Sequence, residues 1–311
     1  MKKRIIFSNQ SMQEILPCLQ KQLEGKEILT FEVLNPDFAQ GYAGYKIEIE
    51  EKEYLYRSYK TWVDLAELLK CKMLTPKESV YPLVTLRFQK LALDSFHIEK
   101  PKIKEEKYGR YSTFFQIYKM EEPAFLYYYM QALDNVKITE KTHVLNLGIN
   151  RGDEFQVIKN KLNTKKYENM KLLGIDYSKT AISYAKQRFP ETNVSLYAHD
   201  INKLKELDLE NFDLLISIGT LQSPDINFKV FLMDLVQNYL SKKAAIILGF
   251  PNSRWTGGEL IYGAKAPNYA MSEMSLLYND VIFAKKYLQQ HKFRVTLTGK
   301  YYVFLTATKI M

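Results

Sequence analysis

The sequence predicts an α/β protein with a doubly wound, mostly parallel sheet and an antiparallel C-terminal edge strand, preceded by a small α+β domain. Three observations support this fold class. The chain has 311 residues, 46% of them apolar, which suffices for about two domains with sizeable cores. From residue 142 onward, short apolar runs alternate with helical patterns, as in parallel sheets covered on both faces. Before residue 100 the patterns are shorter and mixed, which indicates a separate domain.

Residues 1–100 carry the pattern of a small α+β domain, and residues 101–112 carry that of a linker. The linker segment begins with Pro101, is rich in charge and has no apolar period. We find no catalytic motif before it and interpret the first domain as an accessory or dimerisation module, with substrate capture as the alternative. Its expected elements are a helix over 12–23, paired strands over 45–50 and 54–59, a helix over 62–69 and a strand over 81–88.

Residues 113–311 form the larger predicted domain. It opens with a long, aromatic-rich helix over residues 113–133. Apolar strands then alternate with helices, and Gly299 joins two closing strands that bring antiparallel pairing to the sheet. The expected strands cover residues 144–147, 171–176, 193–197, 212–218, 244–250, 293–298 and 301–307. One expected helix follows the first of these strands and ends near residue 162, and the others cover residues 179–189, 228–240 and 281–290.

The formal net charge of +9 raises the question of a nucleic-acid partner. Residues 1–110 hold 19 Lys and Arg against 16 acidic residues, and the rest of the chain holds 25 against 19. No basic run is longer than Lys2–Arg4, whereas binding to a phosphate backbone usually needs a concentrated patch. We therefore favour a lysine-rich solvated surface, keep RNA as the alternative partner and do not expect DNA.

The sequence offers no motif for a membrane span, a disulfide or a metal. The longest apolar run, Ala244–Phe250, is far shorter than the ~20 residues of a spanning helix. The basic start of the chain reaches polar residues before a signal-peptide core can form. Cys18 and Cys71 are the only cysteines and lack a Cys-x-x-Cys spacing, so we expect a reducing, cytoplasmic setting without a membrane or a bound metal.

Three features meet at the carboxyl ends of the first strands of the larger domain, where open α/β sheets bind their ligands. The first is the turn Gly148–Gly152, in which glycine allows close approach and Asn150 suits a left-handed backbone. The second is Asp176, placed where a carboxylate accepts ribose hydroxyls. The third is Asp200, placed where a short polar side chain can read an adenine amino group. Together they predict a nucleoside-containing ligand.

The helix after the glycine turn narrows the choice of ligand. It opens with Asp153 and Glu154, which the helix dipole favours but which would repel a pyrophosphate. A dinucleotide is therefore disfavoured, and no Gly-Lys-Ser/Thr motif supports ATP. A ligand that carries an ammonium and a sulfonium tolerates the two carboxylates, which favours S-adenosylmethionine.

Residues 140–307 resemble the class I S-adenosylmethionine-dependent methyltransferases. Val144–Gly152 is similar to the first motif of that family, Gly174–Ser178 to its second and Ala198–Asp200 to its third. The resemblance implies a Rossmann-like methyltransferase fold, with S-adenosylmethionine as the methyl donor and S-adenosylhomocysteine as the product.

The resemblance also implies roles for individual residues. Gly148 and Gly152 would form the loop beside the methionine part of the cofactor, and Asp176 would bind the ribose. Asp200 and Ile201 would contact the adenine. The full set expected to contact the cofactor is Asn146, Gly148, Asn150, Gly152, Asp176, Tyr177, Asp200, Ile201, Ser217 and Gly219.

The chain departs from the family at two positions of the first motif. Asn146 stands where the family has an acid, and Asn150 stands where it has the middle glycine. Loss of a negative charge near the sulfonium leaves open whether activity is reduced or abolished. Within residues 212–255, Ile218–Gln222 and Gly249–Trp255 resemble segments of the MetW family, which we interpret as a shared branch of the fold rather than a shared function.

Polar residues after the fourth and fifth strands of the larger domain are expected to bind the methyl acceptor. The segment from Pro251 to about Ala270 is long and rich in glycine, so we interpret it as an active-site lid, with a packed surface loop as the alternative. The sequence has no motif for adenine-N6 or cytosine-C5 methylation. The expected acceptor-binding residues are Thr220, Gln222, Asn252, Arg254, Trp255 and Tyr262.

These observations predict a cytoplasmic methyltransferase that acts on a small molecule. No catalytic motif is required, because the cofactor brings the electrophile and the protein positions the nucleophile. The first alternative is a tRNA or rRNA acceptor. The second is a methyltransferase-fold protein that binds the cofactor or a partner without catalysis. A homodimer is compatible with the sequence, which does not identify the acceptor atom.

Overall fold

The chain folds into two compact units. The computed structural model describes residues 4–38, 41–92, 103–263 and 274–310. The first unit comprises Met1–Asp94 and Trp255–Ile261, and the second comprises Ser95–Arg254 and Tyr262–Met311.

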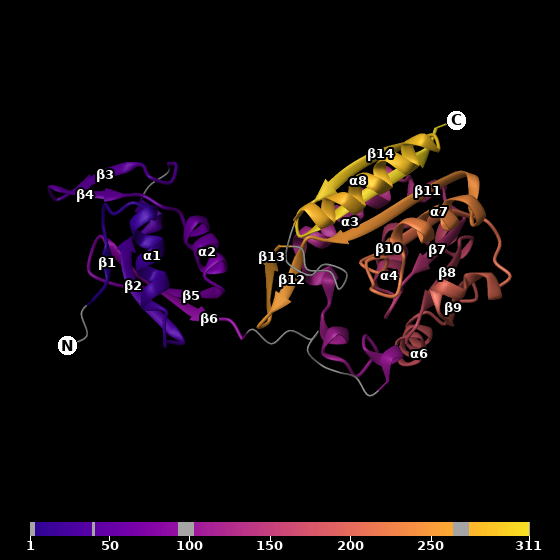
Figure 1. The fold of residues 1–311 in the computed structure, drawn as a ribbon, viewed down its shortest axis with the longest axis horizontal. Coiled ribbons are helices and arrows are strands. Elements are labelled where there is room, and N and C mark those ends of the chain that lie inside the picture. Colours follow the sequence, from indigo (N-terminus) through magenta and orange to yellow (C-terminus); the bar gives the residue numbers. More distant parts are fainter. Residues whose placement is uncertain (1–3, 39–40, 93–102, 264–273, 311) are drawn as a thin grey trace. The chain divides into compact units, whose positions relative to one another are not determined.

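The first unit is an α+β domain with its own core. Its elements are β1 (Ile6–Phe7), α1 (Met12–Gln22), β2 (Ile28–Leu34), β3 (Lys46–Ile49), β4 (Lys52–Leu55), α2 (Tyr59–Leu68), β5 (Cys71–Glu78) and β6 (Leu83–Lys90). Four strands form a sheet in the order β1-β2-β6-β5, and β3 pairs with β4 as the predicted hairpin. Both helices pack against one face of this sheet (Figure 1). There the ring of Phe31 contacts the rings of Phe88 and Trp62. The sequence analysis missed β1, β2 and β5.

The second unit is built on a seven-stranded sheet, which confirms the predicted fold class. Its strands are β7 (His143–Leu147), β8 (Lys171–Asp176), β9 (Val194–Ala198), β10 (Phe212–Ile218), β11 (Leu240–Pro251), β14 (Phe293–Gly299) and β15 (Tyr302–Lys309). Their order is β14-β15-β11-β10-β7-β8-β9. The pairs from β11 to β9 are parallel, and β15 runs antiparallel to both β11 and β14. The antiparallel strand therefore lies next to the edge strand, β14.

Helices cover both faces of this sheet, because its strands are apolar on both sides. They are α3 (Pro123–Asn135), α4 (Asp153–Lys161), α5 (Thr164–Glu168), α6 (Lys179–Arg188), α7 (Phe228–Asn238) and α8 (Met274–Gln290). On one face, α3, α4 and α6 pack around residues such as Val144 and Ile216. On the other, α7 and α8 pack around Leu145 and Leu215 (Figure 1). Neighbouring residues of one strand thus serve two cores, as in a doubly wound sheet.

The predicted helix over residues 113–133 is corrected at its start. Residues 113–121 form two short 3₁₀ turns, η3 (Thr113–Gln116) and η4 (Lys119–Glu121), and the α-helix begins only at Pro123. Proline fits the first turn of a helix but pushes the preceding residue into an extended conformation. Glu122 accordingly has φ −83° and ψ 107°. The proline was the local signal for this boundary.

The long connection after β11, interpreted from the sequence as a lid or a packed surface loop, contains a hairpin. Its strands are β12 (Ser253–Thr256) and β13 (Glu259–Tyr262). The two turn residues, Gly257 and Gly258, both have positive φ, as tight hairpins of this length require. The rest of the predicted lid, residues 264–270, lies outside the described residues.

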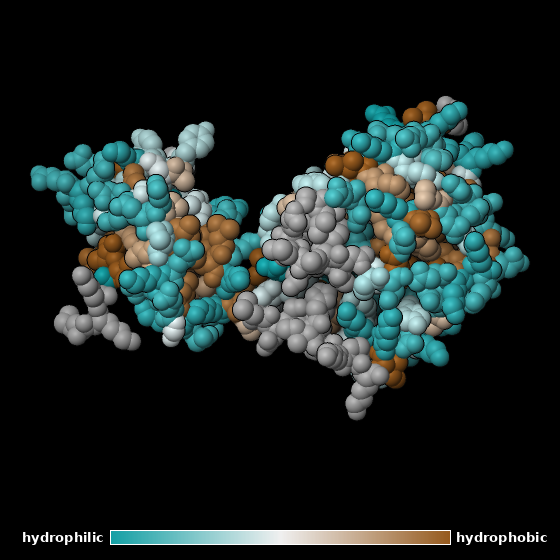
Figure 2. Space-filling view, in the orientation of Figure 1, coloured by the Kyte–Doolittle hydropathy of each residue, from teal (hydrophilic) through white to brown (hydrophobic). Residues whose placement is uncertain are grey.

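The described residues contain no helix that combines the length and apolarity needed to cross a bilayer. Hydrophilic side chains, with some hydrophobic ones between them, make up much of the coloured surface of the second unit in Figure 2.

Candidate functional site

The order of the strands reverses beside β7. From β7 the chain proceeds outward through β8 and β9, and it then returns to the other side of β7 as β10 and β11. The carboxyl ends of β7 and β10 therefore flank the topological switch point, where open α/β sheets bind ligands. The predicted glycine turn follows β7, Asp176 ends β8, and Gly219 follows β10, so the structure brings these predicted residues to one edge.

The glycine turn after β7 has the backbone that the sequence predicted. Gly148, Asn150 and Gly152 all have positive φ, at 80°, 46° and 85°. A Cβ added to Gly148 would overlap the hydroxyl of Thr220, which follows β10. Glycine is therefore required there both by the backbone and by the close approach of the two loops.

The Asp176 carboxylate anchors the loops on either side of it. It accepts hydrogen bonds from the backbone N–H groups of Asn150 and Ser178, each at 2.9 Å. Burial raises the pKa of Asp176, although these two N–H groups act in the opposite direction. Asp176, the residue predicted to bind the ribose, thus also holds the glycine turn against the end of β8.

The buried side chain of Asn146 has an unused donor. The residue is 1% exposed, and no described residue accepts a hydrogen bond from its Nδ2 atom. Leaving a buried donor unpaired costs stability, which a ligand with an acceptor atom would recover. Asn146 thus lacks the negative charge of the acid that the family has at this position, but its Nδ2 group offers a hydrogen-bond donor at the predicted cofactor site.

The two carboxylates that open α4 differ in their partners. Asp153 forms ion pairs with Arg188 at 2.7 Å and with Arg151 at 3.2 Å, so its charge is balanced. Burial, followed by the charge of Asp153, raises the pKa of Glu154 to about 7, and Lys119 opposes this shift. The expectation that both carboxylates would repel a pyrophosphate is therefore corrected: Asp153 is paired with two arginines, and the pKa of Glu154 is raised to about 7.

A segment predicted as a linker packs onto the second unit. We call residues 103–116 the strap. Its Glu106 carboxylate accepts hydrogen bonds from the hydroxyls of Ser178 and Thr180, the first at 2.9 Å. The Nδ2 atom of Asn150 donates to the carbonyl of Tyr108 at 2.7 Å.

The strap also reaches the other side of the switch point. Lys104 forms an ion pair at 3.0 Å with Asp225, which lies in the connection after β10. Arg151 of the glycine turn donates to the carbonyl of Phe115 at 3.0 Å. The strap therefore touches the loops after β7, β8 and β10, and its residues flank Asp176.

Three of the residues predicted to contact the cofactor form hydrogen bonds within the protein. Asp200 caps the 3₁₀ turn η6 (Ile201–Glu206) by accepting from the N–H of Asn202 at 2.9 Å. The Ser217 hydroxyl donates to the carbonyl of Leu147 at 3.1 Å, so its proton joins β10 to β7. Tyr177 is exposed, and its hydroxyl donates to Glu105 of the strap at 3.2 Å.

The predicted acceptor residues lie after β10 and β11, and two of them are buried. A Cβ added to Gly219 would lie 3.6 Å from Pro251, so the two connections run side by side. Gln222 is 2% exposed and Asn252 is 5% exposed. Trp255 groups with the first unit, whereas Arg254 and Tyr262 belong to the second.

The sequence analysis missed a lysine at this edge. Lys119 of η4 lies 5.1 Å from the ring of Tyr302 in β15. Burial alone would lower the pKa of Lys119, but the charges of Tyr302 and Glu154 outweigh it and raise that pKa. No local signal distinguishes this lysine, because its partners come from residues 154 and 302.

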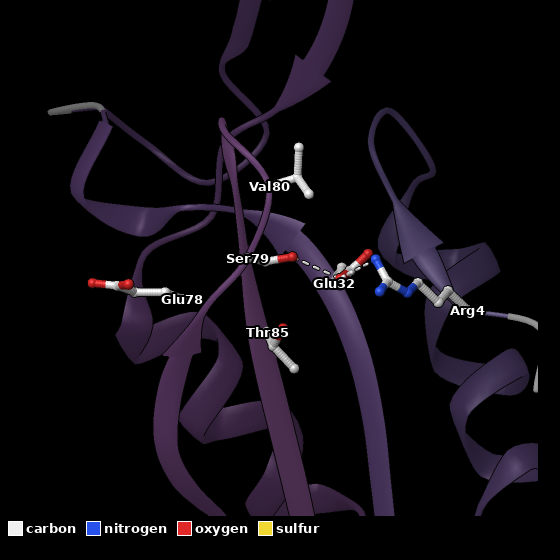
Figure 3. A pocket seen from close by; sticks show the side chains of 6 residues that line it. All are labelled: Arg4, Glu32, Glu78, Ser79, Val80 and Thr85. Atoms are coloured by element: carbon white, nitrogen blue, oxygen red, sulfur yellow. Dashed lines mark hydrogen bonds and ion pairs between the residues drawn. The ribbon is translucent and has the colours of Figure 1, made fainter.

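A surface cavity of about 360 Å³ lies in the first unit. In Figure 3 its Glu32 carboxylate faces Ser79 and Arg4, at 2.6 Å from the Ser79 hydroxyl and 3.6 Å from the Arg4 guanidinium. The charged groups of Glu32 and Arg4 are thus already paired with each other. Among the described residues, no group of three acidic, histidine or cysteine side chains is arranged to hold a metal.

Comparison with known proteins gives one family. A family model described as a methyltransferase domain matches residues 138–297, slightly more than half of the chain. No curated protein matches the sequence.

Solved structures show similar folds at low identity. An S-adenosylmethionine-dependent methyltransferase from Aquifex aeolicus is 17% identical, with a TM-score of 0.42 over 58% of this chain and 89% of that one. The plantazolicin methyltransferase BpumL, solved with S-adenosylhomocysteine, is 13% identical, with a TM-score of 0.46 over 67% of this chain and 94% of that one.

Proposed function

The chain belongs to the class I S-adenosylmethionine-dependent methyltransferases, and from this premise we propose that it methylates a small molecule. S-Adenosylmethionine is its methyl donor and supplies an electrophilic methyl group on a sulfonium. The protein's own task is to hold the donor, orient the acceptor and keep water away from the reacting atoms.

The observation that carries the proposal is the convergence at the switch point. The positive-φ turn after β7, the half-buried Asp176 carboxylate and the unpaired Nδ2 donor of Asn146 lie at one edge of one sheet. These groups suit a ligand with a ribose and with acceptor atoms near β7. We assign the following residues to the cofactor site: Asn146, Gly148, Asn150, Gly152, Asp176, Tyr177, Asp200, Ile201, Ser217 and Gly219.

The acceptor is proposed to bind beside Thr220, which lies against Gly148. A small molecule fits the buried position of Gln222 and Asn252 better than a polynucleotide does. The spread of the basic residues over the whole chain also gives no concentrated electrostatic footprint for RNA. Arg254 and Tyr262 complete the proposed acceptor residues in the second unit.

Calorimetric titration with S-adenosylmethionine and S-adenosylhomocysteine tests the proposal. We expect the wild-type protein to bind both, and Asp176→Asn to weaken both affinities by about tenfold or more, since it removes a charged acceptor for hydroxyl groups. Asp208→Asn, which alters an exposed carboxylate, is the matched control. Circular dichroism must show that the variants are folded, because Asp176 also anchors two loops.

Either of two results would contradict the assignment. Failure of the wild-type protein to bind either compound, with no ligand retained from purification, would mean that the pocket does not hold the cofactor. Unchanged affinity of a folded Asp176→Asn variant would mean that the ribose binds elsewhere.

A further inference from the structure

Asn252 presents a buried oxygen whose direction is fixed. Its Nδ2 atom donates to the carbonyl of Lys300 at 3.0 Å, and its backbone N–H donates to the carbonyl of Tyr301 at 2.9 Å. A flipped amide would set two oxygens against each other at Lys300, so Oδ1 must face away from that carbonyl. No described residue donates to this Oδ1, although Asn252 is 5% exposed.

Gln222, on the neighbouring connection, holds a second buried amide oxygen. It is 2% exposed, and its Oε1 atom has no donor among the described residues. Buried amide oxygens nearly always have a hydrogen-bond partner in folded proteins. These two oxygens follow adjacent strands at the edge where the cofactor is proposed to bind, so both are available to a ligand bound there.

The two oxygens belong to one region of the site. Gln222 follows β10 and Asn252 follows β11, and these strands pair in parallel through Ile218 and Gly249. The contact continues past this pair, where Gly219, the residue after β10, lies against Pro251, the last residue of β11. Gln222 is three residues from the first of these contact points, and Asn252 is one residue from the second.

We propose, resting on the function proposed above, that Gln222 and Asn252 select a methyl acceptor that presents N–H or O–H groups, namely an amine or a hydroxyl compound. Two lone-pair oxygens attract such donors and repel a carboxylate or a phosphate. In the transfer, a lone pair of the acceptor nitrogen or oxygen forms the bond to the methyl carbon. The carbon–sulfur bond breaks with its electron pair on sulfur, and the N–H or O–H proton leaves to water.

Four compounds of similar shape test this preference: benzylamine, benzyl alcohol, toluene and benzoate. Each is titrated by ligand-observed NMR against protein loaded with S-adenosylhomocysteine, whose binding is measured first by calorimetry. We expect benzylamine and benzyl alcohol to bind about three- to tenfold more tightly than toluene and benzoate, the effect of about one hydrogen bond.

Gln222→Leu separates recognition from folding. Because it removes an unpaired buried oxygen, we expect an unchanged or higher Tm together with loss of the preference for donors. Gln131→Leu is the matched control, since Gln131 Oε1 in α3 is also buried without a described partner. We expect this control to keep the preference.

The remaining outcomes overturn the proposal. These are equal or tighter binding of toluene or benzoate, no binding of any of the four compounds, retention of the preference by Gln222→Leu, or its loss in Gln131→Leu. If S-adenosylhomocysteine itself does not bind, the calorimetry overturns the proposed function, and this inference falls with it.

Discussion

The two carboxylates at the start of α4 differ in whether a cation pairs with them. Asp153 is held by two arginines, whereas Glu154, which is 9% exposed, has no ion pair among the described residues. Removing a carboxylate from water favours its neutral form, and the negative charge of Asp153 adds to this effect. Glu154 is therefore a protonatable group beside the glycine turn, at a pH close to neutrality.

Glu154 makes stability fall as pH rises. Its pKa is about 7 in the folded protein, against an ordinary value of 4.5. Between these values the folded protein retains a proton that the unfolded chain has lost, so the free energy of unfolding decreases with pH. We expect Glu154→Gln to remove this decrease and to gain roughly 1–3 kcal/mol on the wild type between pH 4.5 and pH 8.

Urea unfolding at a series of pH values measures this difference. The exposed Glu168→Gln in α5 serves as the control and should follow the wild-type curve. Parallel curves for Glu154→Gln and the wild type would show that Glu154 titrates alike in the folded and unfolded chain.

At the scale of elements, polar contacts of Glu106 attach the strap to the start of α6. Glu106 has two hydroxyl donors, and it also accepts from the backbone N–H of Thr180 at 3.2 Å. A Cβ added to Gly109 would overlap the Glu106 carboxylate and approach the Thr180 hydroxyl within 2.7 Å. The strap can lie this close to α6 because position 109 is a glycine.

Loss of the Glu106 carboxylate is expected to loosen the strap. In Glu106→Ala, hydrogen exchange over residues 103–116 should accelerate by about three- to tenfold, since contacts of this type contribute about 1 kcal/mol. Dissociation of S-adenosylhomocysteine should accelerate as well, because the strap flanks Asp176. Glu121→Ala, an exposed carboxylate in η4, is the control. Unchanged exchange would mean that Glu106 does not hold the strap.

At the scale of the whole molecule, the chain passes between the two units more than once. It leaves the first unit after Asp94, returns to it for Trp255–Ile261 and then completes the second. Within the first unit, a Cβ added to Gly257 would lie 3.0 Å from the backbone nitrogen of Ala92. The hairpin that follows β11 therefore lies within the sequence of the methyltransferase domain, but its residues Trp255–Ile261 group with the first unit.

The charge of the whole molecule also bears on its substrate. The net charge of +9 arises from residues distributed along the whole chain. We expect bulk tRNA to bind weakly, with a shallow dependence of the affinity on salt, when measured by filter binding or fluorescence anisotropy. Tight binding with a steep negative salt dependence would favour an RNA acceptor over a small molecule.

Local patterns in the sequence were sufficient to predict the strands of the sheet in the second unit and the backbone of the glycine turn. Apolar runs such as residues 212–218 predict strands wherever they lie, and Gly148 and Asn150 signal their own backbone. Two wrong predictions could also have been avoided from local signals. Proline at residue 123 marks the true start of α3, and the alternation of Leu29, Phe31 and Val33 indicates the missed β2.

The partners of the site residues depend on distant parts of the chain and became visible only in the folded protein. Arg188 neutralises Asp153 from 35 residues away, and Glu106 meets Thr180 across 74. Asn252 is oriented by Lys300, 48 residues later. The sequence shows which side chains can donate or accept, but burial and topology decide which of them find a partner and which are left for a ligand.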